Sequence, residues 1–163
     1  MAQYTGKVWV LGDDIDTDII IPTEYLALKT IEDMKQYGFS PLRPELAGQI
    51  KPGDIIVAGK NFGCGSSREQ APEVIKALGI PCIIAKSFAR IFYRNALNNG
   101  LLLLEQPELH DVVNEGDTIT VTVNEDVEYN GKKYPIASLP ENLMEIIEAG
   151  GLVKAMRKRN GLD

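Results

Sequence analysis

The chain has 163 residues, of which 44% are hydrophobic and 25% are charged, as in a soluble protein with one globular domain. Its net charge of −6 argues against a surface that binds nucleic acid. Its two cysteines are too few for a disulfide framework. Because no apolar run approaches the length of a membrane span and no signal peptide is recognisable, we expect a cytoplasmic protein without a membrane partner.

Apolar runs along the chain predict the strands. The main runs are Lys7–Leu11, Asp54–Gly59, Ile80–Ala85, Leu101–Leu104 and Thr118–Val123. A shorter run, Ile19–Pro22, also has the pattern of a strand and ends in proline. Residues 126–136 predict a hairpin that turns at Asn130-Gly131, because both residues tolerate positive φ.

Helical patterns lie between several of these runs. The expected helices are Thr30–Tyr37, Glu73–Leu78, Phe88–Asn98, Asn142–Glu148 and Leu152–Arg159. The first is capped by Thr30 and the third by Ser87. Residues 23–29 and 39–52 show no period and are interpreted as loops. Strands that alternate with helices favour an α/β core with parallel pairing, in a single domain covering residues 1–163.

The stretch Asn61–Pro72 connects an expected strand to an expected helix, and it is the strongest candidate for a site. A strand end, a turn and a helix N-terminus bring several backbone N–H groups together, which suits an anion. Gly63 and Gly65 allow positive φ and a close approach to a ligand. Polar side chains follow the glycines: Ser66, Ser67 and Arg68. The guanidinium group matches a carboxylate in geometry and charge.

Other interpretations of this loop stay open at the level of the residues. Ser66 and Ser67 each stand three positions before a glutamate or glutamine, which is the spacing of a helix-capping box. A cysteine hydrolase that uses Cys64 and His110 is a weaker alternative, because the sequence offers no third residue to orient the histidine. The acidic stretch at residues 13–18 lacks the glycine and glutamate of a calcium loop.

Three stretches together carry a resemblance to a known family: Gly12–Pro22, Asn61–Glu69 and Ser87–Asn95. In their sequence, order and spacing they resemble the small subunits of 3-isopropylmalate dehydratases, which correspond to the swivelling fourth domain of aconitase. The resemblance implies an α/β fold, a swivelling β/β/α three-layer domain. It also implies a hydro-lyase of leucine biosynthesis, which isomerises 2-isopropylmalate and 3-isopropylmalate through isopropylmaleate.

The resemblance also implies roles for individual residues. The catalytic serine of the family falls on Ser66, and Asp18 matches an aspartate of the acid–base network. The expected substrate-binding positions are Gly65, Ser67, Arg68, Ala27 and Leu28. Ala27 and Leu28 follow a Tyr-Leu pair. In relatives, the residues after this pair face the variable arm of the substrate. Two apolar residues there favour an isopropyl group over the additional carboxylate of homocitrate or citrate.

The family uses a [4Fe–4S] cluster, and this chain lacks the three cysteines that would hold one. The resemblance therefore implies no metal on this chain and a large subunit that carries the cluster, in a heterodimer or heterotetramer. The isolated chain could also form a homo-oligomer. Arg90 and Arg94 stand four residues apart and are interpreted as structural or interface residues. The alternatives are a homoaconitase or methylmalate-type dehydratase subunit, or a dicarboxylate-binding module without catalysis.

Overall fold

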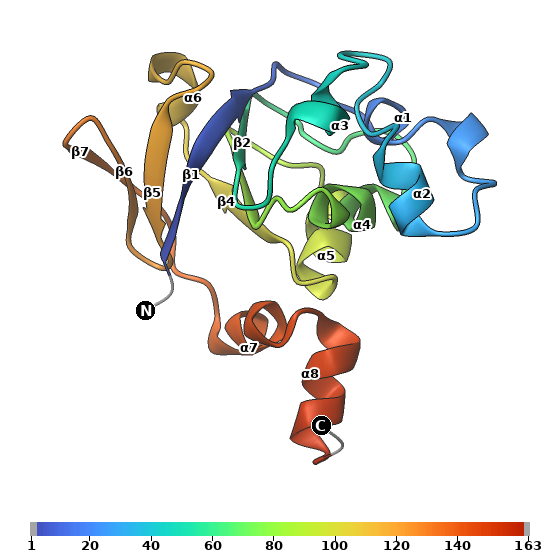
Figure 1. Ribbon diagram of the computed structural model, residues 1–163. Helices are drawn as coiled ribbons and strands as arrows, with labels where there is room; N and C mark the ends of the chain where they lie inside the picture. The colour runs from blue at the N-terminus through green and yellow to red at the C-terminus, as the bar shows by residue number, and fades with distance from the viewer. Residues whose placement is uncertain (1–2, 162–163) are drawn as a thin grey trace.

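One mixed sheet of seven strands runs through the computed structural model, which describes residues 3–161 (Figure 1). The strands are β1 (Gln3–Val10), β2 (Ile55–Ala58), β3 (Cys82–Ala85), β4 (Leu102–Glu105), β5 (Thr118–Thr122), β6 (Asp126–Tyr129) and β7 (Lys132–Pro135). They lie in the order β4-β3-β2-β1-β5-β6-β7. Strands β1 to β4 pair in parallel, which confirms the expected parallel core. The β6–β7 hairpin is also confirmed, with φ of 51° at Asn130 and 77° at Gly131.

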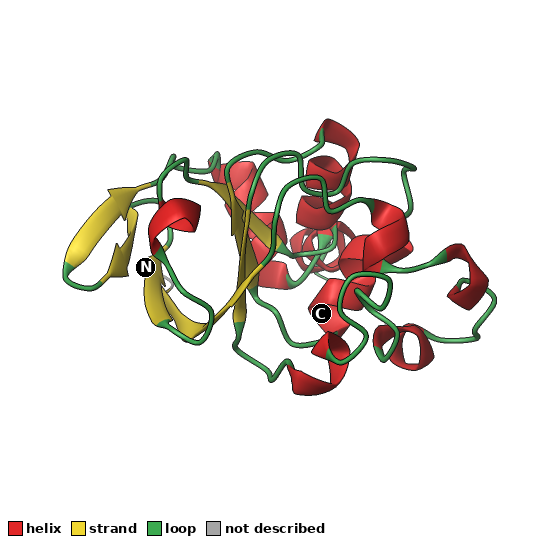
Figure 2. Cartoon of the chain, turned by 90° about the horizontal axis from the view of Figure 1, so that it is seen from above, coloured by secondary structure: helices red, strands yellow, loops and turns green. Residues whose placement is uncertain are grey.

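The sheet separates two hydrophobic cores. Along β2, Ile56 packs into the core on the helix side, whereas Ile55 and Val57 pack into the other core. Val121 of β5 and Val127 of β6 belong to that second core, because the sheet curls and its antiparallel part folds over the parallel part. Strands β5–β7, strands β1–β4 and the helices thus form three successive layers (Figure 2). This arrangement is the expected β/β/α three-layer domain.

Most of the helices cover the outer face of the parallel strands, and the last two form an arm at the carboxyl end. They are α1 (Thr17–Ile20), the 3-10 helix η1 (Thr23–Tyr25), α2 (Ile31–Lys35), α3 (Leu46–Gln49), α4 (Gln70–Ala77), α5 (Arg90–Asn98), α6 (Leu109–Val112), α7 (Glu141–Ala149) and α8 (Leu152–Arg159). Helices α4 and α5 bury Val74, Ile75 and Phe92 in the helix-side core. Helix α6 packs Leu109 into the second core, and α7 packs Ile147 there as well. Helix α8 extends away from the body (Figure 1). Within residues 3–161, no helix is both long and apolar enough to span a bilayer.

The apolar run at Ile19–Pro22 was predicted as a strand, and that prediction was wrong. Residues 17–20 form α1, because the Asp16 side chain caps a helix there: its Oδ1 accepts a hydrogen bond from the backbone N–H of Ile19 at 2.8 Å. The cap predicted at Thr30 is confirmed, since its hydroxyl accepts from the N–H of Asp33 at 3.1 Å.

The amino-terminal ends of the two core helices also differ from the prediction. Helix α4 begins at Gln70 rather than at Glu73. Helix α5 begins two positions later than expected and has no side-chain cap. The Ser87 hydroxyl, which was predicted to cap it, accepts instead from the backbone N–H of Asn61 at 2.8 Å. Ser87 therefore connects the loop after β3 to the candidate loop after β2.

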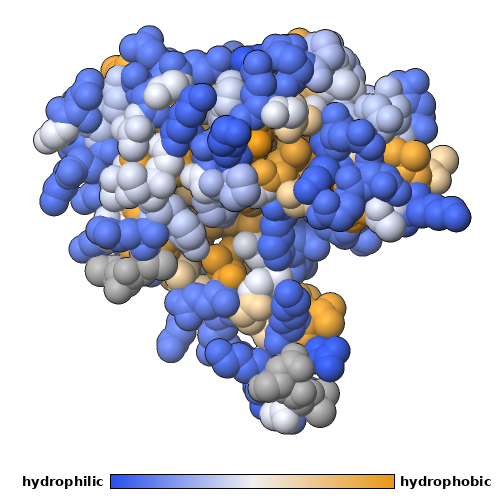
Figure 3. All heavy atoms as spheres, in the orientation of Figure 1, coloured by the Kyte–Doolittle hydropathy of each residue, from blue (hydrophilic) through white to orange (hydrophobic). Residues whose placement is uncertain are grey.

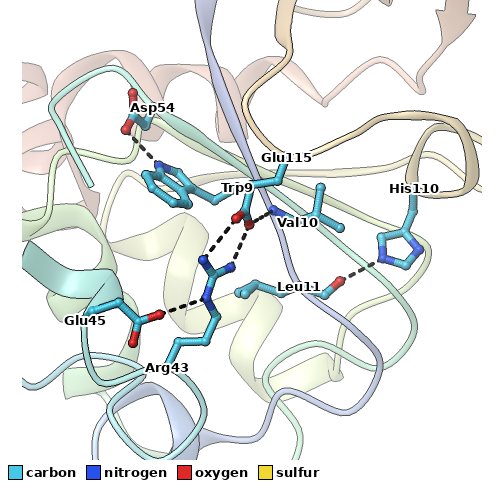
Figure 4. A network of polar contacts seen from close by, with 8 residues as sticks. All are labelled: Trp9, Val10, Leu11, Arg43, Glu45, Asp54, His110 and Glu115. Atoms are coloured by element: carbon cyan, nitrogen blue, oxygen red, sulfur yellow. Dashed lines mark hydrogen bonds and ion pairs between the residues drawn. The ribbon is translucent and has the colours of Figure 1, made fainter. Parts of the chain in front are cut away.

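A network of polar contacts holds the carboxyl end of β1 in place (Figure 4). The guanidinium group of Arg43 donates to both carboxylate oxygens of Glu115, at 2.6 and 3.0 Å, and Glu115 also accepts from the N–H of Val10 at 3.2 Å. The hydrogen-bonded pair raises the pKa of Arg43 and lowers that of Glu115. The indole N–H of Trp9 donates to the buried Asp54 at 2.8 Å. The acidic loop after β1 therefore starts from a fixed position.

Candidate active site

Three loops meet at the carboxyl ends of the parallel strands β1, β2 and β3. They are residues 11–16, 59–69 and 86–89, and they contain most of the three stretches that carry the family resemblance. The N–H of Gly63 donates to the carbonyl of Ile15 at 2.7 Å, and Phe62 forms a parallel bridge with Phe88. Ligands of α/β proteins commonly bind at this edge of the sheet. Segments that are distant in the chain thus form one candidate site.

The turn that carries the serines is fixed by close packing. Gly63 is buried with φ of 85°, and a β-carbon added to it would lie 2.2 Å from Cγ of Phe92. Gly65 has φ of 94° but more space around it. A side chain at positive φ is strained, so both positions favour glycine. At position 63 a side chain would also collide with Phe92, so glycine is needed there for two reasons.

Thr17 fastens the same turn from the opposite side. Its hydroxyl donates to the carbonyl of Ser66 at 2.9 Å, and its backbone N–H donates to the carbonyl of Cys64 at 2.9 Å. Its side chain is buried, with 2% exposed. The sequence analysis gave Thr17 no role, because a threonine between aspartates has no distinctive signal. In the structure it fixes the backbone that carries Ser66.

The serine hydroxyls do not cap helix α4. The residue at its N-cap is Glu69, and no side chain makes a capping hydrogen bond there. Ser66 and Ser67 are exposed, and within residues 3–161 neither hydroxyl forms a hydrogen bond. The capping-box interpretation is therefore wrong, and both hydroxyl groups are available to a ligand.

Arg68 and Asp18, which were both selected as site residues, contact each other. Nη2 of Arg68 lies 2.5 Å from Oδ1 of Asp18, and the same nitrogen donates to the Thr23 hydroxyl at 2.7 Å. Nη1 donates to the carbonyl of Ile21 at 2.9 Å. Arg68 thus connects the serine loop to the segment around η1. Only part of its donor capacity remains for a ligand carboxylate.

A cavity of about 230 Å³ lies at this junction. Its lining residues come from the serine loop, from α1 and from the start of α5: Thr17, Gly63, Gly65, Ser66, Ser67, Arg68, Ala89, Arg90, Ile91, Phe92 and Asn95. Arg90 therefore lines the same cavity as the serines, whereas Arg94 does not. The cavity is smaller than a typical complete ligand pocket, and two arginines with two hydroxyls give it the character of an anion site.

Ala27 and Leu28 do not line this cavity. Leu28 packs against the helix-side core together with Leu26, and Tyr25 stacks on Tyr37 with ring centroids 3.9 Å apart. These contacts attach the loop to the body of the protein. Ala27 is exposed and remains free to face a ligand or a partner.

Neither cysteine has the surroundings of a nucleophile. Burial and the nearby Asp16 carboxylate raise the pKa of the Cys64 thiol, and burial raises the pKa of Cys82 to about 12. His110 is held on α6, where its Nε2–H donates to the carbonyl of Leu11 at 2.7 Å (Figure 4). These contacts speak against a hydrolase built on Cys64 and His110. Among residues 3–161, no cluster of three or more potential ligands could hold a metal ion.

Comparisons with known proteins agree with this geometry. The family model described as aconitase C-terminal domain matches residues 24–109. The chain is 80% identical to the 3-isopropylmalate dehydratase small subunit of Lachnospira eligens, over 99% of this chain and 98% of that protein. It is 48% identical to the isopropylmalate/citramalate isomerase small subunit of Methanocaldococcus jannaschii, over 94% of each.

A solved structure shows the same fold. The crystal structure of a 3-isopropylmalate dehydratase chain from Methanocaldococcus jannaschii superposes with a TM-score of 0.92 at 39% identity. The match covers 99% of this chain and 97% of that one. The chain therefore belongs to the family of 3-isopropylmalate dehydratase small subunits, within the aconitase superfamily.

Proposed function

We propose that this chain contributes the catalytic base and the carboxylate contacts to a 3-isopropylmalate dehydratase that acts in leucine biosynthesis in the cytoplasm. As a family member, the chain is a subunit of a hydro-lyase and works with a large subunit. The observation that carries the proposal is Ser66, which is exposed, caps no helix and lies on a fixed loop beside Arg68. A subunit that supplies only the base and the carboxylate contacts needs an anion-binding turn with an available hydroxyl group.

Ser66 removes the proton from the carbon next to the one that loses the hydroxyl group. A serine hydroxyl is a weak base in water, so its alkoxide must be stabilised electrostatically. Within residues 3–161, the backbone N–H groups of Gly65, Ser66 and Ser67 donate no hydrogen bond to a backbone carbonyl, so they remain available as donors. Together with the positive charge of Arg68, these donors favour a negative charge on the Ser66 oxygen.

The substrate carboxylate binds beside the base. The Ser67 hydroxyl and the remaining N–H groups of Arg68 are available as donors, and Arg90 adds a second positive charge at the same cavity. Asp18 keeps the Arg68 guanidinium in place through the 2.5 Å contact and belongs to the acid–base network across the cleft. Gly65 allows the backbone to approach the ligand closely.

The residues of this chain do not fit a [4Fe–4S] cluster. The sequence contains two cysteines, and the Cys82 side chain is fully buried in the core. We therefore assign the cluster to the large subunit, where it would supply the Lewis acid for the leaving hydroxyl group. In this assignment the chain contributes the base and the binding groups.

The hydrogen bond from Thr17 to the Ser66 carbonyl leads to a prediction about catalysis. We expect Thr17→Val in the assembled enzyme to lower kcat by about tenfold to a hundredfold, because a small displacement of a catalytic group is costly. KM should stay within about twofold, and Thr17→Ser should restore most of the rate because it keeps the hydroxyl. Steady-state kinetics with 3-isopropylmalate measures both constants.

A double variant gives the corresponding control. If Thr17 acts through Ser66, adding Thr17→Val to Ser66→Ala should lower kcat no further. If Thr17→Val lowered kcat by the same factor with and without Ser66→Ala, this positioning role would be contradicted.

Ala27 leads to a prediction about the substrate. We expect a kcat/KM for 3-isopropylmalate at least about tenfold higher than for homocitrate, because a carboxylate buried near Ala27 would lack a partner. Ala27→Arg should shift the preference toward the tricarboxylate. Leu42→Arg is the control, since it places the same charge at another exposed apolar position. An unchanged preference in Ala27→Arg would remove the basis for this substrate assignment.

One experiment tests the proposed function as a whole. The chain is co-expressed with its large subunit, the cluster is rebuilt anaerobically, and isopropylmalate, homocitrate, citrate and methylmalate are assayed side by side. Methylmalate belongs in the set because one relative is named an isopropylmalate/citramalate isomerase subunit. Turnover of isopropylmalate well above the other three supports the proposal, and its absence refutes it.

A further inference from the structure

Helix α5 exposes a face that contacts no other element among residues 3–161. Phe92, Ala96 and Leu97 are buried on its inner side. Arg90, Ile91 and Arg94 are exposed on its outer side, and we call these three residues the α5 ridge. Ile91 is 55% exposed, which is high for a large apolar side chain close to a functional cavity. The ridge thus combines one apolar residue with two positive charges.

The two arginines of the α5 ridge are not neutralised within the chain. Among residues 3–161, neither Arg90 nor Arg94 forms an ion pair or a hydrogen bond through its side chain. The neighbouring Lys86 differs, because it pairs with Asp111 at 2.7 Å. In a chain with a net charge of −6, this positive ridge is a local exception. Its charge fits an acidic partner surface.

The α5 ridge is continuous with the candidate active site. Arg90 and Ile91 line the same 230 Å³ cavity as Ser66. On its other side, Arg90 borders a second hollow of about 340 Å³, which is lined partly by the aromatic residues Phe88 and Tyr93. A protein that closes this cavity over Ser66 would therefore contact Arg90 and Ile91 of the ridge, and the second hollow can accept one of its side chains.

We propose that the α5 ridge and the hollow beside it form the docking surface for the large subunit. This inference rests on the proposed function, in which the large subunit brings the rest of the active site to Ser66. The surface of the large subunit that meets the ridge carries an acidic side chain opposite Arg94 and an apolar contact for Ile91, whereas Arg90 faces the shared cavity. Closure of this contact excludes water from the serine base.

A second exposed apolar surface lies on α8 and serves as a comparison. Leu152, Val153 and Met156 are exposed there, and Val153 is 72% exposed. They stand near a hollow of about 1050 Å³ between the carboxyl-terminal arm and the body, where Figure 3 shows apolar side chains. No residue that lines this hollow also lines the Ser66 cavity. A partner bound only to α8 would therefore leave the active site incomplete.

The test compares two matched substitutions in the full-length chain. We expect Ile91→Glu to weaken binding to the purified large subunit by about tenfold or more, because a charge would enter an apolar contact. Val153→Glu places the same charge on another exposed β-branched residue, which is 72% exposed against 55% for Ile91. The Kd of this variant should stay within about twofold of that of the unmodified chain. Isothermal titration calorimetry measures Kd, and circular dichroism of each variant alone checks folding.

Further variants separate the possible outcomes. Arg94→Glu should also weaken binding to the large subunit. This variant tests the docking proposal if Ile91→Glu does not fold. Ser66→Ala should keep its Kd while losing turnover, so failure of the catalytic proposal is distinguishable from failure of the docking proposal. The docking proposal is overturned if the ridge variants bind normally, or if Val153→Glu weakens binding as much as they do.

Discussion

Ser66→Ala in the assembled enzyme is expected to lower kcat by about a thousandfold or more, because the variant lacks the group that accepts the substrate proton. KM should remain within about twofold, since the hydroxyl acts in the transition state and the carboxylate contacts stay in place. Folding should be unaffected, because the side chain is exposed and caps no helix. Steady-state kinetics, with thermal unfolding of the isolated chain, measures all three quantities.

Ser67→Ala is the matched control for this variant, because it removes the neighbouring exposed hydroxyl from the same loop. It should raise KM, with a smaller effect on kcat, as expected for a residue that binds the carboxylate. If Ser66→Ala behaved like Ser67→Ala, or like the unmodified chain, Ser66 would not be the base.

Gly63→Ala is expected to lower the free energy of unfolding by about 3 kcal/mol, the combined cost of a strained backbone and an overpacked core. The added β-carbon would lie 2.2 Å from Cγ of Phe92, which is itself 3% exposed and has little room to move. Movement of either group would displace the serine loop, so activity should fall as well. Urea denaturation of the isolated chain measures the change in stability.

Gly48→Ala provides the control for that measurement. Gly48 lies in α3, its φ is not positive, and an added β-carbon would meet nothing within 4 Å. The free energy of unfolding of Gly48→Ala should differ from that of the unmodified chain by less than about 1 kcal/mol, and any change should be stabilising. Equal stabilities of the two alanine variants would show that the packing of the loop on Phe92 leaves room for a side chain at position 63.

The sheet was largely predictable from the sequence, because its signals are local. The buried strands are continuous apolar runs, and all four residues of β2, Ile55–Ala58, are indeed buried. The β6–β7 turn was predictable because Asn130-Gly131 suits positive φ at both positions. Helices α7 and α8 also lie close to the predicted ranges.

Helix beginnings were less predictable, because a polar side chain can bond to a distant segment instead of to its own helix. The Ser87 hydroxyl binds the backbone of Asn61 and leaves α5 without a side-chain cap. The run Ile19–Pro22 was misread because its apolar residues suit a strand, whereas the cap from Asp16 starts a helix. Helices α3 and α6 span only four residues each, which is too short for a periodic pattern.

The candidate site was predictable in its residues but not in its connections. Ser66, Arg68 and Asp18 were selected through a family resemblance, and the turn around them through its glycines. The contact between Arg68 and Asp18 joins segments that are far apart in the chain, so no local pattern indicates it. The same holds for Thr17, whose hydroxyl reaches the Ser66 carbonyl only in the folded protein.

The claim that this chain holds one half of an active site is tested most directly by titration with the large subunit. The purified chain is added stepwise to a fixed amount of the cluster-loaded large subunit, and dehydration of 3-isopropylmalate is followed. We predict no turnover by either chain alone, and a rate that rises to a plateau as the large subunit becomes saturated. Turnover by this chain alone, or by the large subunit without it, would contradict the account.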